Sequence, residues 1–188
     1  EYGRMHFLHE IDHADDNGVR PLPADLPQEV KDYFNRTETP PWLYEYGNVE
    51  EARDLAINVF DEDVVAFVVA LLCKALPECY AGANGAEVLS YTGQLGEPNY
   101  EDPKVQDTLV RRVVETAVFV RNVYRKEYWE GRNHRAIRTI RKVRLFHSGV
   151  RTMIERHDKE GIRKWDMEKL GIPINQQDTV GTLMAFSI

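Results

Sequence analysis

Residues 133–161 read NHRAIRTIRKVRLFHSGVRTMIERHDKEG, and they carry the longest helical pattern in the chain. Apolar side chains recur there at intervals of three and four residues, as they do on the core-facing side of an α-helix. Asn133 suits the start of this helix and Gly161 suits its end. The expected apolar face contains Ile137, Ile140, Val143, Phe146, Val150 and Ile154. His147 falls on the same face, so we predict that it lies on a buried stripe of a long helix.

Shorter helical patterns precede and follow this stretch. The expected helices cover residues 28–34, 49–76 (as a pair), 86–91, 103–124, 166–170 and 176–186. Asp102, Asp166 and Asn175 are the expected N-caps of the helices that follow them, and Pro103 suits a first helical position. Because no pair of strands is indicated, the predicted fold class is all-α.

The segment around the two cysteines leads to further expectations. The apolar run Val64 to Leu72 is expected to be a buried core helix, because it is well short of the roughly 20 residues that cross a bilayer. No membrane span is predicted. Pro77 is expected to stop or kink the chain. Cys73 and Cys79 are interpreted as buried structural thiols, because their spacing fits neither a zinc CxxC pair nor a disulfide framework.

Length and composition indicate one soluble globular domain of 188 residues. Residues 1–47 are expected to form a proline-rich N-terminal wrapping segment, and residues 48–188 the main helical domain. The formal net charge of −7 argues against nonspecific nucleic-acid binding, because neutralising phosphates requires an excess of Lys and Arg.

Two clusters of charged or metal-binding residue types suggest alternative functions. His6, His9 and His13 would share one face of a helix, as a metal site requires, although they lie at an end of the chain that is prone to fray. A basic run repeats every third residue and therefore spirals around its helix; it consists of Arg132, Arg135, Arg138, Arg141 and Arg144. An anion or nucleic-acid binder centred on residues 132–164 is one hypothesis that follows.

Arg144, His147 and Arg151 fall at positions i, i+3 and i+7 and share a helix face on or beside the apolar stripe. Buried guanidinium groups need anionic partners. A haem would supply an iron for the imidazole and propionates for the arginines, while the acidic first half of the chain is an alternative source of partners.

The segment VRLFHSGVR, followed by GIPINQQDTVGTLMAF, resembles the rubber-oxygenase family, which includes the latex-clearing proteins and related fungal and bacterial oxygenases. Upstream, LPECYAGANGAEVLSYTGQL and RRVVETAVFV are similar to that family's pattern in the expected order. The resemblance covers roughly residues 48 to 188.

This resemblance implies a globin-like helical bundle around a b-type haem. The histidine of the RxxHxxxR motif, His147 here, would be the protein ligand to the iron, and Arg144 and Arg151 match the motif's arginines. Arg112 and Thr116 match the conserved pair of an upstream helix and would form or support the haem pocket as catalytic residues. In the family, the iron binds dioxygen, and the better-known members cleave the carbon–carbon double bonds of polyisoprene.

The sequence departs from the family pattern at two places. Glu115 is acidic where rubber-cleaving members tend to carry a basic residue, and the family follows the helix at Ile188 with further helices, so a truncated domain is expected. Val68, Leu72 and Val118 are candidates for apolar pocket walls, and Glu87 or Glu97 for a distal base.

We therefore predict a haem-b oxygenase that uses O2 on an apolar or polymeric isoprenoid substrate. The alternative is a helical scaffold of the same family without oxygenase activity, which binds haem or a protein partner. Secretion after removal of an upstream signal is compatible with the sequence.

Overall fold

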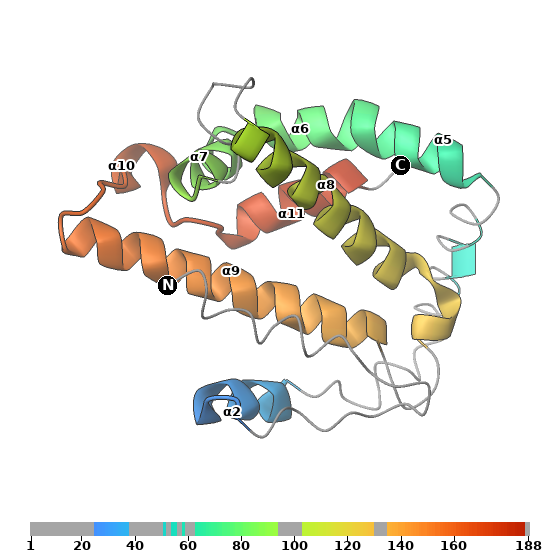
Figure 1. Ribbon diagram of the computed structural model, residues 1–188, viewed down its shortest axis with the longest axis horizontal. Helices are drawn as coiled ribbons and strands as arrows, with labels where there is room; N and C mark the ends of the chain where they lie inside the picture. The colour runs from blue at the N-terminus through green and yellow to red at the C-terminus, as the bar shows by residue number, and fades with distance from the viewer. Residues whose placement is uncertain are drawn as a thin grey trace. The chain divides into compact units, whose positions relative to one another are not determined.

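The computed structural model describes residues 25–37, 63–93, 103–129 and 135–186, together with positions 51, 54, 55 and 58. Every regular element in these residues is a helix, which confirms the predicted all-α class for the described part of the chain. Figure 1 labels the α-helices. The elements are α2 (Gln28–Arg36), α5 (Val64–Ala70), the π-helical turn η2 (Leu71–Ala75), α6 (Leu76–Ala81), α7 (Ala83–Tyr91), α8 (Pro103–Tyr124), the 3-10 turn η3 (Lys126–Tyr128), α9 (Arg135–Lys159), α10 (Met167–Leu170) and α11 (Gln176–Phe186).

Several predicted helix ends are confirmed by their capping contacts. α8 begins at Pro103 and ends at Tyr124, as expected. Asp166 caps α10, where its carboxylate accepts a hydrogen bond from the Lys169 amide at 3.0 Å. Asn175 caps α11, because its side-chain oxygen accepts from the Asp178 amide at 2.9 Å and Asp178 accepts in return from the Asn175 amide at 3.3 Å. The predicted caps Asp102 and Asn133 lie outside the described residues.

The C-terminal end of α9 also agrees with the prediction. Gly161 adopts a φ of +69°, the left-handed conformation that glycine accommodates without steric cost. The Ile162 amide then donates to the His157 carbonyl at 2.9 Å, which satisfies one of the unpaired carbonyls of the last turn.

The chain divides into two compact units, which comprise residues 1–62 with 118–144 and residues 63–117 with 145–188. In the first unit, Phe34 of α2 is buried, and the guanidinium of Arg141 lies 4.9 Å from the centre of its ring. The Tyr33 hydroxyl donates to the Arg141 carbonyl at 3.0 Å. These contacts attach the described part of the predicted wrapping segment to α9; the rest of residues 1–47 lies outside the described residues, and the predicted division at residue 48 stays a prediction.

The second unit has a hydrophobic core where α7 and α9 meet the loop before α10. Its buried residues are Val88, Tyr91, Val150, Ile154 and Trp165. The Tyr91 hydroxyl donates to the Arg163 carbonyl at 2.7 Å, and Arg163 donates back to the Tyr91 carbonyl at 2.8 Å. The Trp165 indole donates to the Gly171 carbonyl at 2.7 Å. This core holds in place the half of α9 that carries His147.

Pro77 does not stop the chain, in contrast to one of the expected outcomes. α5, η2 and α6 follow one another without a break, and the direction changes by 89° only at Gly82, before α7 (Figure 1). A proline lacks the amide that would complete the helical bond to the preceding turn. The π-helical turn before it, in which the Leu76 amide donates to the Leu71 carbonyl, accommodates that loss.

The expectation that the apolar run at α5 is buried is wrong for most of its side chains. Phe67 is buried, but Val65 is 73% exposed and Val69 is 51% exposed. Cys73 is exposed and Cys79 is half-buried, and both are free thiols, so the prediction of two buried thiols is also wrong. Most of these side chains are exposed because the buried side of this segment is narrow; it runs through Phe67 and Ala75.

Among the described helices, no single one has both the length and the apolar composition needed to cross a membrane. The bent pair Val65–Ala81 and Ala83–Tyr91 meets both requirements only when its two members are taken together.

Candidate functional site

His147 lies near the middle of α9, and its side chain is half-buried. Its ring centre is 6.3 Å from that of Phe146, which packs against the core of the second unit. Burial lowers the pKa of His147, and the positive charges of Arg112 and Arg151 lower it further. The imidazole makes no hydrogen bond with a described side chain or backbone group. The environment therefore favours a neutral ring with an available nitrogen lone pair.

Around Arg112, the α8 helix turns two polar side chains inward and leaves neighbouring valines exposed. Arg112 and Thr116 are half-buried, whereas Val110 is 62% exposed and Val114 is 54% exposed. The valines of α8 are themselves divided, because Val113 is 49% exposed and Val120 is 4% exposed. Apolar residues occur almost all around α8, so the periodicity did not reveal which side faces inward.

Arg112 and Thr116 occupy successive turns on the inner side of α8. The Thr116 hydroxyl donates to the Arg112 carbonyl at 2.9 Å, within the helix. The Arg112 guanidinium donates to the Glu115 carboxylate at 2.9 Å, and Arg111 approaches the same carboxylate at 3.8 Å. Glu115 was not predicted as a site residue, although a separation of three residues from Arg112 is a recognised signal for an ion pair on a helix.

Arg151 is held by the loop that precedes α11. Its Nη1 donates to the Ile174 carbonyl at 2.5 Å and lies 3.5 Å from the Pro173 carbonyl. Ile174 has a φ of +50°, a strained conformation for a β-branched residue, and the bond from Arg151 helps to hold it. The guanidinium therefore finds backbone acceptors, where the sequence argument expected anionic groups.

Arg144 differs from Arg151 because its side chain is exposed. It forms no ion pair or hydrogen bond with the described residues. The expectation that both arginines are buried beside His147 is therefore wrong for Arg144, since an exposed guanidinium is satisfied by water. The structure brings Arg112 and Arg151 close enough to act on His147 electrostatically, with Thr116 one turn beyond Arg112 on α8.

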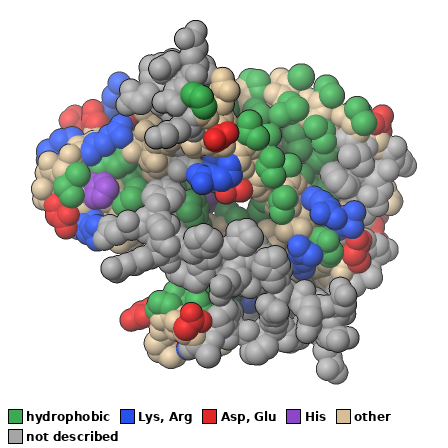
Figure 2. Space-filling model, viewed as in Figure 1, with side chains coloured by type: hydrophobic (Ala, Val, Ile, Leu, Met, Phe, Trp, Pro, Cys, Tyr) green, Lys and Arg blue, Asp and Glu red, His purple; other side chains and the backbone are tan. Residues whose placement is uncertain are grey.

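Apolar side chains remain exposed on several helices of the second unit. On α11, Val180, Leu183 and Met184 are more than half exposed and recur at helical spacing. This helix contacts η2 and α6. Figure 2 shows hydrophobic side chains gathered over α5 and α6. The predicted wall residues Val68 and Leu72 of this unit are 43% and 46% exposed, so each presents apolar surface that the described side chains leave open; Val118, which belongs to the first unit, is 44% exposed.

The remaining sequence-predicted candidates are three histidines near the start of the chain and two glutamates. His6, His9, His13 and Glu97 lie outside the described residues. Within the described residues, no cluster of three or more His, Cys, Asp or Glu is arranged to hold a metal ion. Glu87 is half-buried on α7.

The basic run is engaged within the protein at two of its central positions. Arg135 lies over the Tyr128 ring at 4.6 Å, and Arg141 donates to the Phe34 carbonyl and to the Thr37 hydroxyl. These contacts reduce the number of arginines available to a polyanion.

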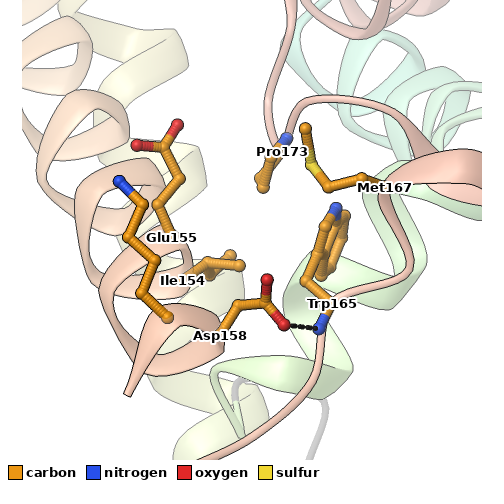
Figure 3. Close-up of a pocket in the computed structure, with 7 residues that line it drawn as sticks. Ile154, Glu155, Asp158, Trp165, Met167 and Pro173 are labelled. Atoms are coloured by element: carbon orange, nitrogen blue, oxygen red, sulfur yellow. Dashed lines mark hydrogen bonds between the residues drawn. The ribbon is translucent and has the colours of Figure 1, made fainter. Parts of the chain in front are cut away.

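A surface cavity of about 200 Å³ lies between α9 and the loop around α10, and the sequence did not predict it. Figure 3 shows Glu155 on one wall, Trp165 and Met167 on the opposite wall and Asp158 below them. The Asp158 carboxylate accepts the Trp165 amide at 3.2 Å. The lining residues are Ile154, Glu155, Asp158, Lys159, Trp165, Met167 and Pro173. None of the predicted site residues lines this cavity.

Comparisons of the chain with protein-family models, with curated proteins and with solved structures found no match. The resemblance to the rubber-oxygenase family therefore stays a prediction that is carried by the motifs themselves.

Proposed function

We propose that this protein is a haem-b-dependent oxygenase in which a globin-like helical bundle holds the haem and His147 is the protein ligand to its iron. The observation that supports this most directly is the state of His147. A half-buried imidazole with a lowered pKa and no hydrogen-bond partner among the described residues has its lone pair available for a metal. The RxxHxxxR motif makes haem iron the expected metal.

The arginines near His147 suit the acidic groups of a haem. Arg144 is exposed and has no partner among the described side chains, so it is available to a propionate. Arg151 uses Nη1 for the Ile174 carbonyl and retains its other N–H donors, because a guanidinium carries five. The residues present therefore fit the group: Arg144 and Arg151 would hold its propionates, and His147 would bind its iron.

We propose that Arg112 and Thr116 are catalytic residues that would line the same haem site. Arg112 places a positive charge near His147, which favours the neutral imidazole that binds iron. When bound, haem would supply the iron centre that activates dioxygen. The exposed valines and leucines of the second unit offer apolar surface to an unsaturated, isoprenoid-like substrate, which needs contact area more than polar recognition.

A second candidate is favoured by the same exposed apolar residues. A helical scaffold that has lost oxygenase activity would use the stripes on α5, α8 and α11 to bind a protein partner, since contiguous exposed apolar surface marks interaction sites. Such a protein either lacks haem or binds haem without consuming oxygen.

The test is an absorption spectrum of the purified protein, oxidised and reduced, for wild type, His147→Ala and His157→Ala. His157 is a matched control because it lies on α9 and is half-buried beside Tyr91, at 6.3 Å between ring centres. We expect a Soret band in wild type and His157→Ala that is lost or shifted in His147→Ala. Oxygen uptake on isoprenoid substrates should follow the same pattern.

A wild-type protein that shows no Soret band, even after addition of haem, would exclude the oxygenase. A Soret band without oxygen uptake on any isoprenoid would favour the inactive scaffold. An unchanged Soret band in His147→Ala would show that His147 does not bind the iron.

A further inference from the structure

Two arginines, Arg112 and Arg151, place positive charge near His147. The protein itself neutralises one of them, Arg112, with a carboxylate. Glu115 accepts a hydrogen bond from the Arg112 guanidinium at 2.9 Å, and its second oxygen lies 3.8 Å from the Arg111 guanidinium. Arg151 is engaged by the Ile174 carbonyl at 2.5 Å. The guanidinium on α8 thus has a carboxylate partner before any ligand arrives.

The position of Glu115 allows this partner to control what else Arg112 binds. The Arg112 side chain is 34% exposed and that of Glu115 is 51% exposed, so the pair lies at the margin of the inner face. A carboxylate is the group that a guanidinium binds best, through charge-assisted hydrogen bonds. An anionic head group that approaches Arg112 competes with Glu115 for the guanidinium donors and also meets the negative charge of Glu115. A neutral head group meets neither obstacle.

We propose that Glu115 is a specificity-determining residue that masks Arg112 and reserves the site for substrates with a neutral head group. This inference rests on the proposed function, because it concerns the substrate of the proposed haem site at His147. It separates neutral isoprenoids, such as alcohols and hydrocarbons, from isoprenoid or fatty carboxylates of equal length. The neighbouring surface agrees with this class, since Val113 and Val114, which lie between Arg112 and Glu115 in the sequence, are exposed and uncharged.

The experiment compares two probes that share one apolar tail, farnesol and farnesoic acid, at a pH near 7.5, where the acid is ionised. Binding of each is measured by calorimetry to wild type, Glu115→Gln, Arg112→Gln and the double variant. Glu160→Gln is the matched control, because Glu160 pairs with Arg156, four residues before it, is 52% exposed and lies just beyond the C-terminal end of α9. Circular dichroism establishes that each variant is folded.

We expect wild type to bind the alcohol at least as tightly as the acid. Glu115→Gln should shift the affinity ratio toward the acid by about tenfold, which is the usual effect of freeing one charged hydrogen-bond donor at a partly exposed site. Binding of the alcohol should change by less than about twofold in this variant. Arg112→Gln combined with Glu115→Gln should abolish the shift, and Glu160→Gln should leave the ratio as in wild type.

A wild type that prefers the acid would overturn the proposal, as would a ratio that Glu115→Gln leaves unchanged. If the shift in affinity ratio persists in the double variant, a group other than Arg112 causes it, and the masking role is wrong. Failure of wild type to bind either probe would also count against the masking role. The Soret spectrum is recorded on the same samples. If the oxygenase proposal is wrong, the haem band will be missing from these spectra. That result does not alter the affinity ratio on which the masking role depends.

Discussion

Replacement of Ile154 by alanine tests whether the core that supports His147 is arranged as described. Ile154 has 0% exposure and belongs to the cluster of Val88, Tyr91, Val150 and Trp165. The substitution removes about three methyl or methylene groups, which at about 0.8 kcal/mol each amounts to about 2.4 kcal/mol of lost transfer free energy. The void that remains adds to this loss, since large-to-small changes at fully buried sites cost about 2–5 kcal/mol.

The cavity beside α9 limits the cost. Ile154 also lines the cavity of about 200 Å³, so the new void joins space that already exists and does not form a closed hole. We therefore expect the free energy of unfolding to fall by about 3 kcal/mol, in the lower half of the range for buried aliphatic residues. Leu183→Ala is the matched control, because Leu183 is 70% exposed on α11 and its truncation should change stability by less than about 0.5 kcal/mol.

The assay is urea unfolding followed by circular dichroism at the helical band, with the midpoint and the slope compared among wild type, Ile154→Ala and Leu183→Ala. A loss below about 1 kcal/mol in Ile154→Ala would refute the packing described for the core. A loss of stability in Leu183→Ala as large as that in Ile154→Ala would contradict the exposure of Val180, Leu183 and Met184 on α11. It would mean that this face of α11 is covered in solution.

Two further predictions follow from local contacts. Asn175→Ala removes the side-chain acceptor of the Asp178 amide and a 3.2 Å hydrogen bond to the Ile172 carbonyl. This substitution should lower the free energy of unfolding by about 1 kcal/mol in the same urea assay. An unchanged midpoint would argue against the cap. Burial, and to a smaller extent the charge of Glu78, raises the pKa of Cys79 above its ordinary value of 9.0, while a hydrogen bond with Thr182 opposes the shift. The thiolate is the reactive form of a cysteine, so the rate of Cys79 alkylation should still rise above pH 9. At pH 8, Cys79 should be alkylated more slowly than the exposed Cys73, as measured by mass spectrometry. Equal rates at the two thiols would contradict this prediction.

Local sequence signals predicted several of the helices and some of their ends. The apolar spacing around residues 137–154 predicted α9, and Asp166 and Asn175 cap the helices that follow them as their side-chain chemistry requires. These signals act over three or four residues, and a helix turn or a cap is complete within that distance. The motif around His147 is equally local, and it is the basis of the proposed haem site.

The tertiary structure alone decided which side of each apolar helix faces inward. α5 and α8 carry apolar residues around most of their circumference, so periodicity could not assign Val65 or Val113 to the surface or Arg112 to a half-buried position. The same limit applies to Arg144 and Arg151, which share a helix face in the sequence and yet differ in burial, because only Arg151 meets the loop at Ile174. Burial depends on segments that are distant in the chain, and a pattern with a period of three to four residues carries no information about them.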